Sequence, residues 1–443
     1  MNQQSYFHSV TLDRDKCKGC INCIKRCPTE AIRVRDGKAK IIKERCIDCG
    51  ECIRVCPHHA KKATFDPLSM LDQFRYTIAL PAPTLYGQFN NLDDVDIVLN
   101  ALLALGFDEV YEVSKAAELV SDATRKLLKS NTIPKPIISS ACPAVTRLIR
   151  VRFPSLIENV LPLHAPVEVA ARLAKEEAMR KTGLPREDIG AIFISPCPAK
   201  VTAAKMPLGT EQSEISAVFA ISEVYPKLLK HMKESPRENL CSSGKIGVSW
   251  ATSTGEAAAL LNDNYLAADG IENVIRVLED LEDEKFSNLD FIELNACNGG
   301  CVGGVLTVEN PYVARTKLKR LRKYLPVSLN HLDAIPDSMN WDVDLQYTPV
   351  MKLDADFQVA LNKMSEMERL ESLLPGLDCG SCGAPSCKAL AEDVVRGFGS
   401  MDDCIFKFRE NIASLIDNVQ KLEELIPKSF LTHEESQTKE DTK

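Results

Sequence analysis

The sequence predicts an α/β protein with mostly parallel sheets, preceded by a small α+β unit and followed by a small helical unit. From about residue 69, short apolar runs alternate with helical segments, which is typical of parallel sheets covered by helices. Outside this stretch, cysteines gather at 17–56 and again at 379–404. We therefore expect units at 1–68, 69–365 and 366–430, followed by a disordered polar tail at 431–443.

Composition narrows the class of protein. The chain has 443 residues, of which 45% are hydrophobic and 26% charged, as in ordinary globular proteins. Its net charge of −8 argues against nucleic acid and anionic membranes as partners. We find no signal-peptide pattern and no apolar run of about 18 residues, so we expect a cytoplasmic protein. Thiols stay reduced there, so the 17 cysteines indicate metal ligation, with zinc sites or core thiols as the alternatives.

The N-terminal cysteines repeat one spacing. The run Cys17-x2-Cys20-x2-Cys23-x3-Cys27-Pro28 recurs from Cys46 to Pro57. This spacing is typical of two 4Fe–4S clusters in a ferredoxin-like module, in which the fourth cysteine of each run ligates the other cluster, and zinc pairs would lack the third and fourth members. The expected ligand sets are Cys17, Cys20, Cys23 and Cys56, and Cys46, Cys49, Cys52 and Cys27. Apolar residues at 31–34 and 39–42 flank Asp36-Gly37 and predict a hairpin.

The central stretch supplies the predicted parallel sheet. Strands are expected at the apolar runs 76–80, 136–140, 191–194, 245–249 and 291–294. Helices are expected at 95–105, closed by Gly106, and at 165–181, which has Pro166 near its start and Gly183 just past its end.

Cys142, Cys197 and Cys297 each follow the carboxyl end of an expected strand, which is where open parallel sheets bind ligands. Cys301 adds a fourth thiol, and four thiolates suffice for a 4Fe–4S cubane. Taken alone, Cys297-x3-Cys301 could also be two buried core thiols near a tight turn. The glycines around this pair would let the backbone approach a bulky group.

The C-terminal region carries another set of four cysteines and a heptad pattern. Cys379, Cys382, Cys387 and Cys404 suit a fourth 4Fe–4S cluster, with zinc as the alternative. Ile412, Leu415, Val419, Leu422 and Ile426 have a/d spacing, which fits either a helix packed on its own domain or a homodimer through 412–426. Cys241 has no cysteine partner and is expected to be a free thiol.

Three segments, Ser139–Pro143, Ser195–Lys200 and Glu293–Gly304, resemble in order the signature motifs of the iron-only (FeFe) hydrogenases, and most closely those of the sensory subgroup. The C-terminal unit resembles a 4Fe–4S domain of Rnf electron-transport subunits. The resemblance implies a two-lobed domain whose cubane joins a diiron unit with CO, cyanide and azadithiolate ligands. It implies that Cys142, Cys197, Cys297 and Cys301 hold the cubane and that Cys301 bridges to the diiron unit. Lys200, Pro83 and Thr84 would then bind the two cyanides.

Departures from the family pattern concern proton delivery. Ala141 stands where the fast enzymes have a proton-relay cysteine, and a methyl group carries no proton. The 120–124 stretch lacks the relay glutamates, while Ser195 and Asn295 replace methionines. We therefore expect slow H2 turnover, used to sense H2 or redox state, with electrons passed to a ferredoxin, a hydrogenase subunit or a signalling protein. The alternatives are a catalytic hydrogenase subunit and an iron–sulfur carrier or assembly protein without the diiron unit.

Overall fold

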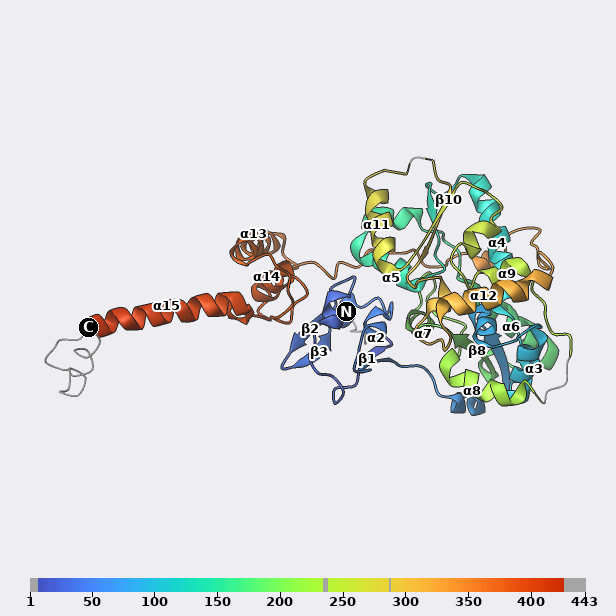
Figure 1. Ribbon diagram of the computed structural model, residues 1–443. Helices are drawn as coiled ribbons and strands as arrows, with labels where there is room; N and C mark the ends of the chain where they lie inside the picture. Colours follow the sequence, from blue (N-terminus) through green and yellow to red (C-terminus); the bar gives the residue numbers. More distant parts are fainter. Residues whose placement is uncertain (1–6, 234–237, 287, 426–443) are drawn as a thin grey trace.

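The computed structural model describes residues 7–233, 238–286 and 288–425. A large central body carries the N-terminal module on one side, and the C-terminal unit lies beyond that module (Figure 1). The last helix, α15 (Ile405–Glu424), extends away from the rest of the chain. Within the described ranges, no helix is both long enough and apolar enough to cross a bilayer.

The N-terminal module consists of two antiparallel strand pairs and two short helices. Strand β1 (Val10–Leu12) pairs with β4 (Lys61–Ala63), and β2 (Ile32–Arg35) pairs with β3 (Lys38–Ile41). Asp36 and Gly37 join β2 to β3 with φ of 55° and 66°, which matches a two-residue hairpin turn and confirms the predicted hairpin. The helices are α1 (Asn22–Lys25) and α2 (Glu51–Arg54).

The central body contains two sheets, and both are parallel, as predicted. The larger sheet has the order β6-β5-β8-β9, with β5 at Tyr76–Pro81, β6 at Glu109–Val110, β8 at Ile189–Ser195 and β9 at Ala217–Ala220. The smaller sheet has the order β10-β11-β7, with β7 at Ile137–Ile138, β10 at Tyr265–Asp269 and β11 at Phe291–Asn295.

Alternating residues of the larger sheet pack into two separate cores. Ile78 and Leu80 of β5 pack with α4 (Val113–Ser130) and α6 (Pro166–Thr182). Ala79 points to the opposite face and packs with α3 (Asp96–Leu105) and α8 (Ile221–His231). Such alternation follows from the two-residue period of a strand, and helices on both faces keep a parallel sheet buried.

The smaller sheet is covered by α5 (Pro143–Arg152) and α11 (Ile271–Glu282), which pack on Ile292 and Leu294 of β11. The remaining helices of the central body are α7 (Pro198–Lys205), α9 (Lys245–Ser249), α10 (Gly255–Ala259) and α12 (Pro311–Leu321).

The prediction of a strand at 245–249 was wrong, because these residues form α9. A short apolar run does not distinguish a strand from a buried helix, and here the tertiary contact decides. Gly247 lies so close to α4 that a Cβ on it would be 2.1 Å from the carbonyl oxygen of Ser114. Residues 245–249 therefore form a helix packed on α4, and the strands β6, β9 and β10 of the central body were not predicted.

The C-terminal unit contains α13 (Phe357–Leu373), α14 (Cys387–Val395) and α15. The boundary predicted at 366 falls inside α13, and Leu370 of α13 and Leu374 just after it pack with Ala389 and Leu390 of α14 in one core, so this unit includes all of α13. Ile426 and the predicted tail lie outside the described residues.

Candidate metal centre

The ends of the two parallel sheets bring four cysteines together. Cys142 follows β7 and Cys297 follows β11, while Cys197 follows β8 of the other sheet and Cys301 begins the next turn after Cys297. Burial raises the pKa of the Cys197 thiol to about 12, and charges on Cys301 and Cys142 act in the same direction. Burial and neighbouring thiolates also raise the pKa of Cys297. These four cysteines are half-buried, and as thiolates they would repel one another, so a metal that replaces their protons would offset that repulsion.

The glycines around Cys301 serve close packing between loops. Gly300 has φ of 89°, and a Cβ on it would lie 2.4 Å from the backbone nitrogen of Ser253. A Cβ on Gly304 would lie 2.2 Å from the carbonyl oxygen of Pro196, in the loop that carries Cys197. The backbone approach that the sequence suggested is therefore directed at neighbouring loops, and it fixes Cys301 relative to Cys197.

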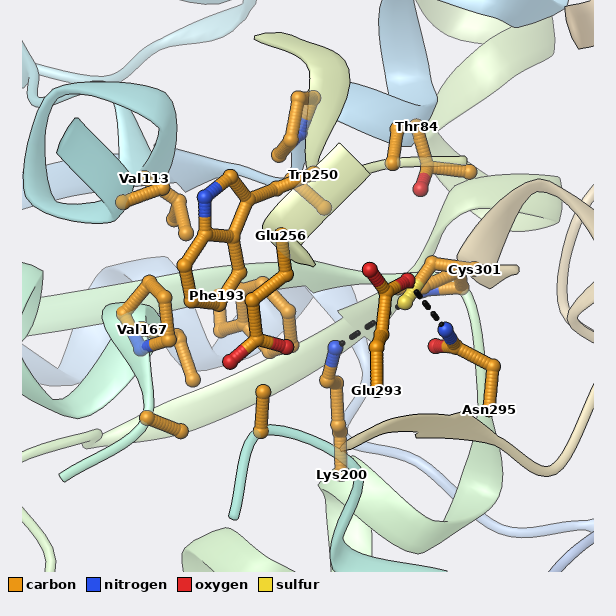
Figure 2. Close-up of a pocket in the computed structure, with 18 residues that line it drawn as sticks. Thr84, Val113, Val167, Phe193, Lys200, Trp250, Glu256, Glu293, Asn295 and Cys301 are labelled. Carbon is orange, nitrogen blue, oxygen red and sulfur yellow. Dashed lines mark hydrogen bonds between the residues drawn. The ribbon is translucent and has the colours of Figure 1, made fainter. Parts of the chain in front are cut away.

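A cavity beside Cys301 collects the side chains expected around the diiron unit. Cys301, Lys200, Pro83, Thr84 and Ala141 all line it (Figure 2). The Lys200 Nζ lies 3.4 Å from the Cys301 Sγ. Burial alone would lower the pKa of Lys200, but the charges of Cys301, Cys197 and Cys142 raise it, so the cavity holds a fixed positive charge next to the predicted bridging thiol.

Thr84 supplies an observation that favours a bound group. Its hydroxyl is buried at the wall of the cavity and has no hydrogen-bond partner among the described residues. A buried hydroxyl without a partner costs about 1–3 kcal/mol. Together with the Lys200 ammonium, it fits a polar, negatively charged ligand such as a metal-bound cyanide.

Two buried glutamates to which the sequence assigned no role complete the cavity wall. Glu256 of α10 accepts a hydrogen bond of 2.7 Å from the Ser139 hydroxyl. Glu293 of β11 accepts backbone N–H bonds from Thr254 at 3.0 Å and Ala257 at 2.8 Å. Burial and then the charge of Glu293 raise the pKa of Glu256. In the sequence, Glu293 could have been noticed as an acidic residue inside the apolar run 291–294. Nothing comparable marks Glu256.

Asn295 and Ser195, the two polar residues that stand in place of methionines, have different roles. The Asn295 amide donates a 2.7 Å hydrogen bond to Glu293 and lines the cavity (Figure 2). Ser195 instead hydrogen-bonds the backbone of Cys197, accepting from its N–H at 3.3 Å and donating to its carbonyl at 3.1 Å. In the 120–124 stretch, the one acidic residue, Asp122, pairs with Arg125 and Lys126 outside the cavity.

The N-terminal cysteines line two separate cavities with the crossed membership that their spacing predicts. One cavity is lined by Cys17, Cys20, Cys23 and Cys56, and the other by Cys27, Cys46, Cys49 and Cys52. Burial raises the pKa of Cys23 to about 11, and charges on Cys20, Cys17 and Cys56 also raise it.

The C-terminal cysteines also gather. Cys382, Cys387 and Cys404 belong to one packed cluster, and the charges of Cys379 and Cys404 raise the pKa of Cys382 after burial does so. Cys379 is exposed, so this set lies at the surface.

The sets of cysteines follow one another through the molecule. After burial, a charge on Cys297 raises the pKa of Cys49, and a charge on Cys23 raises the pKa of Cys52. The central set and the Cys49 set are therefore neighbours, and so are the two sets of the N-terminal module. The Lys25 ammonium then joins the module to the C-terminal loop, donating to the carbonyls of Asp378 at 2.7 Å and Pro385 at 3.0 Å.

The cysteine sets and parallel sheets define an iron–sulfur protein. A family model for the iron-only hydrogenase large subunit, C-terminal domain, matches residues 75–259 and 251–305. A 4Fe-4S dicluster domain model matches 9–57, and an Fe–S cluster model matches 374–406. The chain belongs to the iron-only hydrogenase family.

Several known hydrogenases are similar to this chain. Iron hydrogenase 1 of Clostridium pasteurianum is 24% identical over 369 residues, which cover 67% of this chain and 64% of the relative. The periplasmic [Fe] hydrogenase large subunit of Nitratidesulfovibrio vulgaris is 24% identical over 361 residues, covering 67% and 86%. A variant of the [FeFe]-hydrogenase HydA1 from Chlamydomonas reinhardtii superposes with a TM-score of 0.48 at 16% identity, covering 59% of this chain and 90% of that structure.

Proposed function

We propose that this iron–sulfur protein binds a hydrogenase-type cluster and turns over H2 slowly, in order to sense H2 or redox state. The observation that carries the proposal is the cavity beside Cys301, which is lined by the Lys200 ammonium and by the Thr84 hydroxyl, a group without a hydrogen-bond partner in the described part of the chain. Cys142, Cys197, Cys297 and Cys301 would hold the cubane. When bound, the diiron unit supplies heterolytic cleavage and formation of H2.

Proton supply is where this chain differs from a fast enzyme. Ala141 lines the cavity at the place where the family has its relay cysteine, and its methyl group neither accepts nor donates a proton. Loss of general acid–base assistance typically lowers a rate by about 10²–10⁴. Slow turnover at an otherwise complete site suits a sensor.

Glu256 favours a second candidate, a catalytic hydrogenase subunit with another proton route. Its carboxyl group is buried in the wall of the same cavity as Ala141 and is held there by Ser139. Because its pKa is raised, this carboxyl keeps its proton near neutral pH and is the acid best placed to supply the cavity. Turnover of tens per second in the wild-type protein would favour this candidate over sensing.

The order of the cysteine sets suggests where a partner would dock. Cys379 is the exposed member of the set farthest from the cavity, so we propose that a redox or signalling protein docks near it. A cytoplasmic location stays a prediction, and one relative is named as periplasmic.

The deciding experiment is an infrared spectrum of protein matured with the diiron unit. Bands from CO and cyanide support both candidates, whereas their absence after full 4Fe–4S loading would leave an iron–sulfur carrier or assembly protein. In matured protein with these bands, Ala141→Cys should raise H2 production by one to two orders of magnitude or more. An unchanged rate would show that proton delivery does not limit turnover.

A further inference from the structure

Helix α15 is an exposed apolar helix without a covering surface in the described chain. Every described side chain from Ile405 to Leu425 is exposed except that of Lys407. The helix extends away from the body along its whole length (Figure 1). Of the two alternatives that the sequence left open, packing on its own domain does not occur among the described residues. A helix with one apolar face buries that face against a partner.

The apolar residues of α15 continue over three heptads. The α15 stripe, as we call it, is 41–63% exposed and consists of Ile405, Phe408, Ile412, Leu415, Val419 and Leu422. Its spacings alternate between three and four residues, so the pattern starts one heptad earlier than the sequence suggested. Isoleucine and valine occupy all a positions, while phenylalanine and leucine occupy all d positions. Branched residues at a with leucine at d favour parallel two-stranded coiled coils.

The ion pairs of α15 lie outside this stripe. Lys407 pairs with Glu410 at 2.7 Å, and Lys421 pairs with Asp417 at 2.7 Å, within the same helix. In a parallel pair, each g position faces the following e position of the other helix. Asn411 would therefore face Ile416, and no like charges would oppose each other there.

We propose that α15 forms a parallel two-stranded coiled coil with α15 of a second copy of this chain. Cys404 directly precedes Ile405, so the dimer places both C-terminal cysteine sets at the same end, on either side of a twofold axis. Helix axes in such a pair are about 8–10 Å apart. A partner that docks at this end would meet two cysteine sets, a consequence that rests on the proposed function, whereas the dimer itself does not.

Oligomeric state tests the dimer. Light scattering on the full-length protein should give twice the chain mass. The double variant Ile412→Asp, Leu415→Asp should give the mass of one chain, because two charges in the stripe would face two more. The matched control Ser414→Asp, Gln420→Asp adds the same charge at outer positions and should stay dimeric. Equal iron content in all three proteins shows that the body is folded.

A wild-type mass of one chain, a mass of three or more chains, or a dimer that survives the stripe substitutions would overturn the proposal. A photo-crosslinking amino acid at Asn411 tests the orientation. In a parallel dimer it attaches to the matching turn of the second helix, between 408 and 416. Attachment mainly at 417–424 would show an antiparallel pair and refute the parallel arrangement. Neither measurement needs the diiron unit, so a failed infrared test and a failed dimer test remain distinguishable.

Discussion

Substitution of Asp393 by asparagine should release the C-terminal unit from the N-terminal module. Asp393 of α14 accepts hydrogen bonds from Arg33 Nε at 2.7 Å and Arg35 Nη2 at 2.6 Å, both from β2. The side chains of Asp393 and Arg33 are only 6% exposed, and that of Arg35 is 20% exposed. Asparagine keeps the shape but leaves both guanidinium groups without their closest carboxylate.

The expected cost follows from this burial. Removing one partner of a buried ion pair typically costs about 3–5 kcal/mol. Glu392 offsets part of this cost, because its carboxylate lies 3.9 Å from Arg33 Nη2 and also pairs with Arg45. We therefore expect about 3 kcal/mol, which is roughly a hundredfold shift in the docking equilibrium at 1.4 kcal/mol per factor of ten.

Hydrogen exchange measures this shift directly. Amides of α14 and β2 should exchange about a hundredfold faster in Asp393→Asn, whereas those of β5 and β8 should not change. The matched control is Glu366→Gln in α13, which removes an exposed pair with Arg369 and should leave exchange unchanged. If α14 exchanges equally in the two variants, the buried ion pairs do not hold the interface.

Three further predictions concern protonation and iron. For the second candidate, in which Glu256 supplies the proton, Glu256→Gln in matured protein should lower H2 production by about 10²–10⁴ with unchanged infrared bands. The raised pKa means that wild-type Glu256 loses its proton as pH rises, so wild-type activity should fall at alkaline pH, and this limb should vanish in the variant. Cys387→Ser should remove about four iron atoms per chain, while Cys241→Ser should remove none. Burial, then Glu112, raise the pKa of Cys241 to about 12, so alkylation of Cys241 should stay far slower than that of free cysteine up to pH 9 and increase only above it. Rapid labelling at pH 8 would contradict that account.

The cysteine sets could be predicted from the sequence because their spacing is local. A run such as Cys17 to Cys27 specifies its own geometry, and the structure reproduces the crossed grouping with Cys56. The parallel sheets were predictable in part for a similar reason, since β5, β7, β8 and β11 are short and mostly apolar runs. The cavity residues Pro83, Thr84 and Lys200 were found through the family motifs rather than through periodicity.

What the sequence could not show depends on distant contacts. Arg33 and Asp393 are 360 residues apart, and neither stands out among the charged residues of the chain. Glu256 lies in a short helix without any motif and becomes notable only when Ser139 is seen beside it. The segment 245–249 was misassigned because close packing of Gly247 on α4, and not the local apolar pattern, decides its conformation.

The four central thiols do not come from one lobe. Cys197 follows the four-stranded sheet, whereas Cys142 and Cys297 follow the three-stranded sheet. A single cluster bound to all of them would be an inorganic cross-link between the two halves of the body. Since such a ligand binds the closed arrangement alone, it stabilises that arrangement by mass action. Iron loading should therefore stiffen the whole body, adding to the core in which Ile137 and Phe291 of the smaller sheet already pack with Ile78 of the larger one.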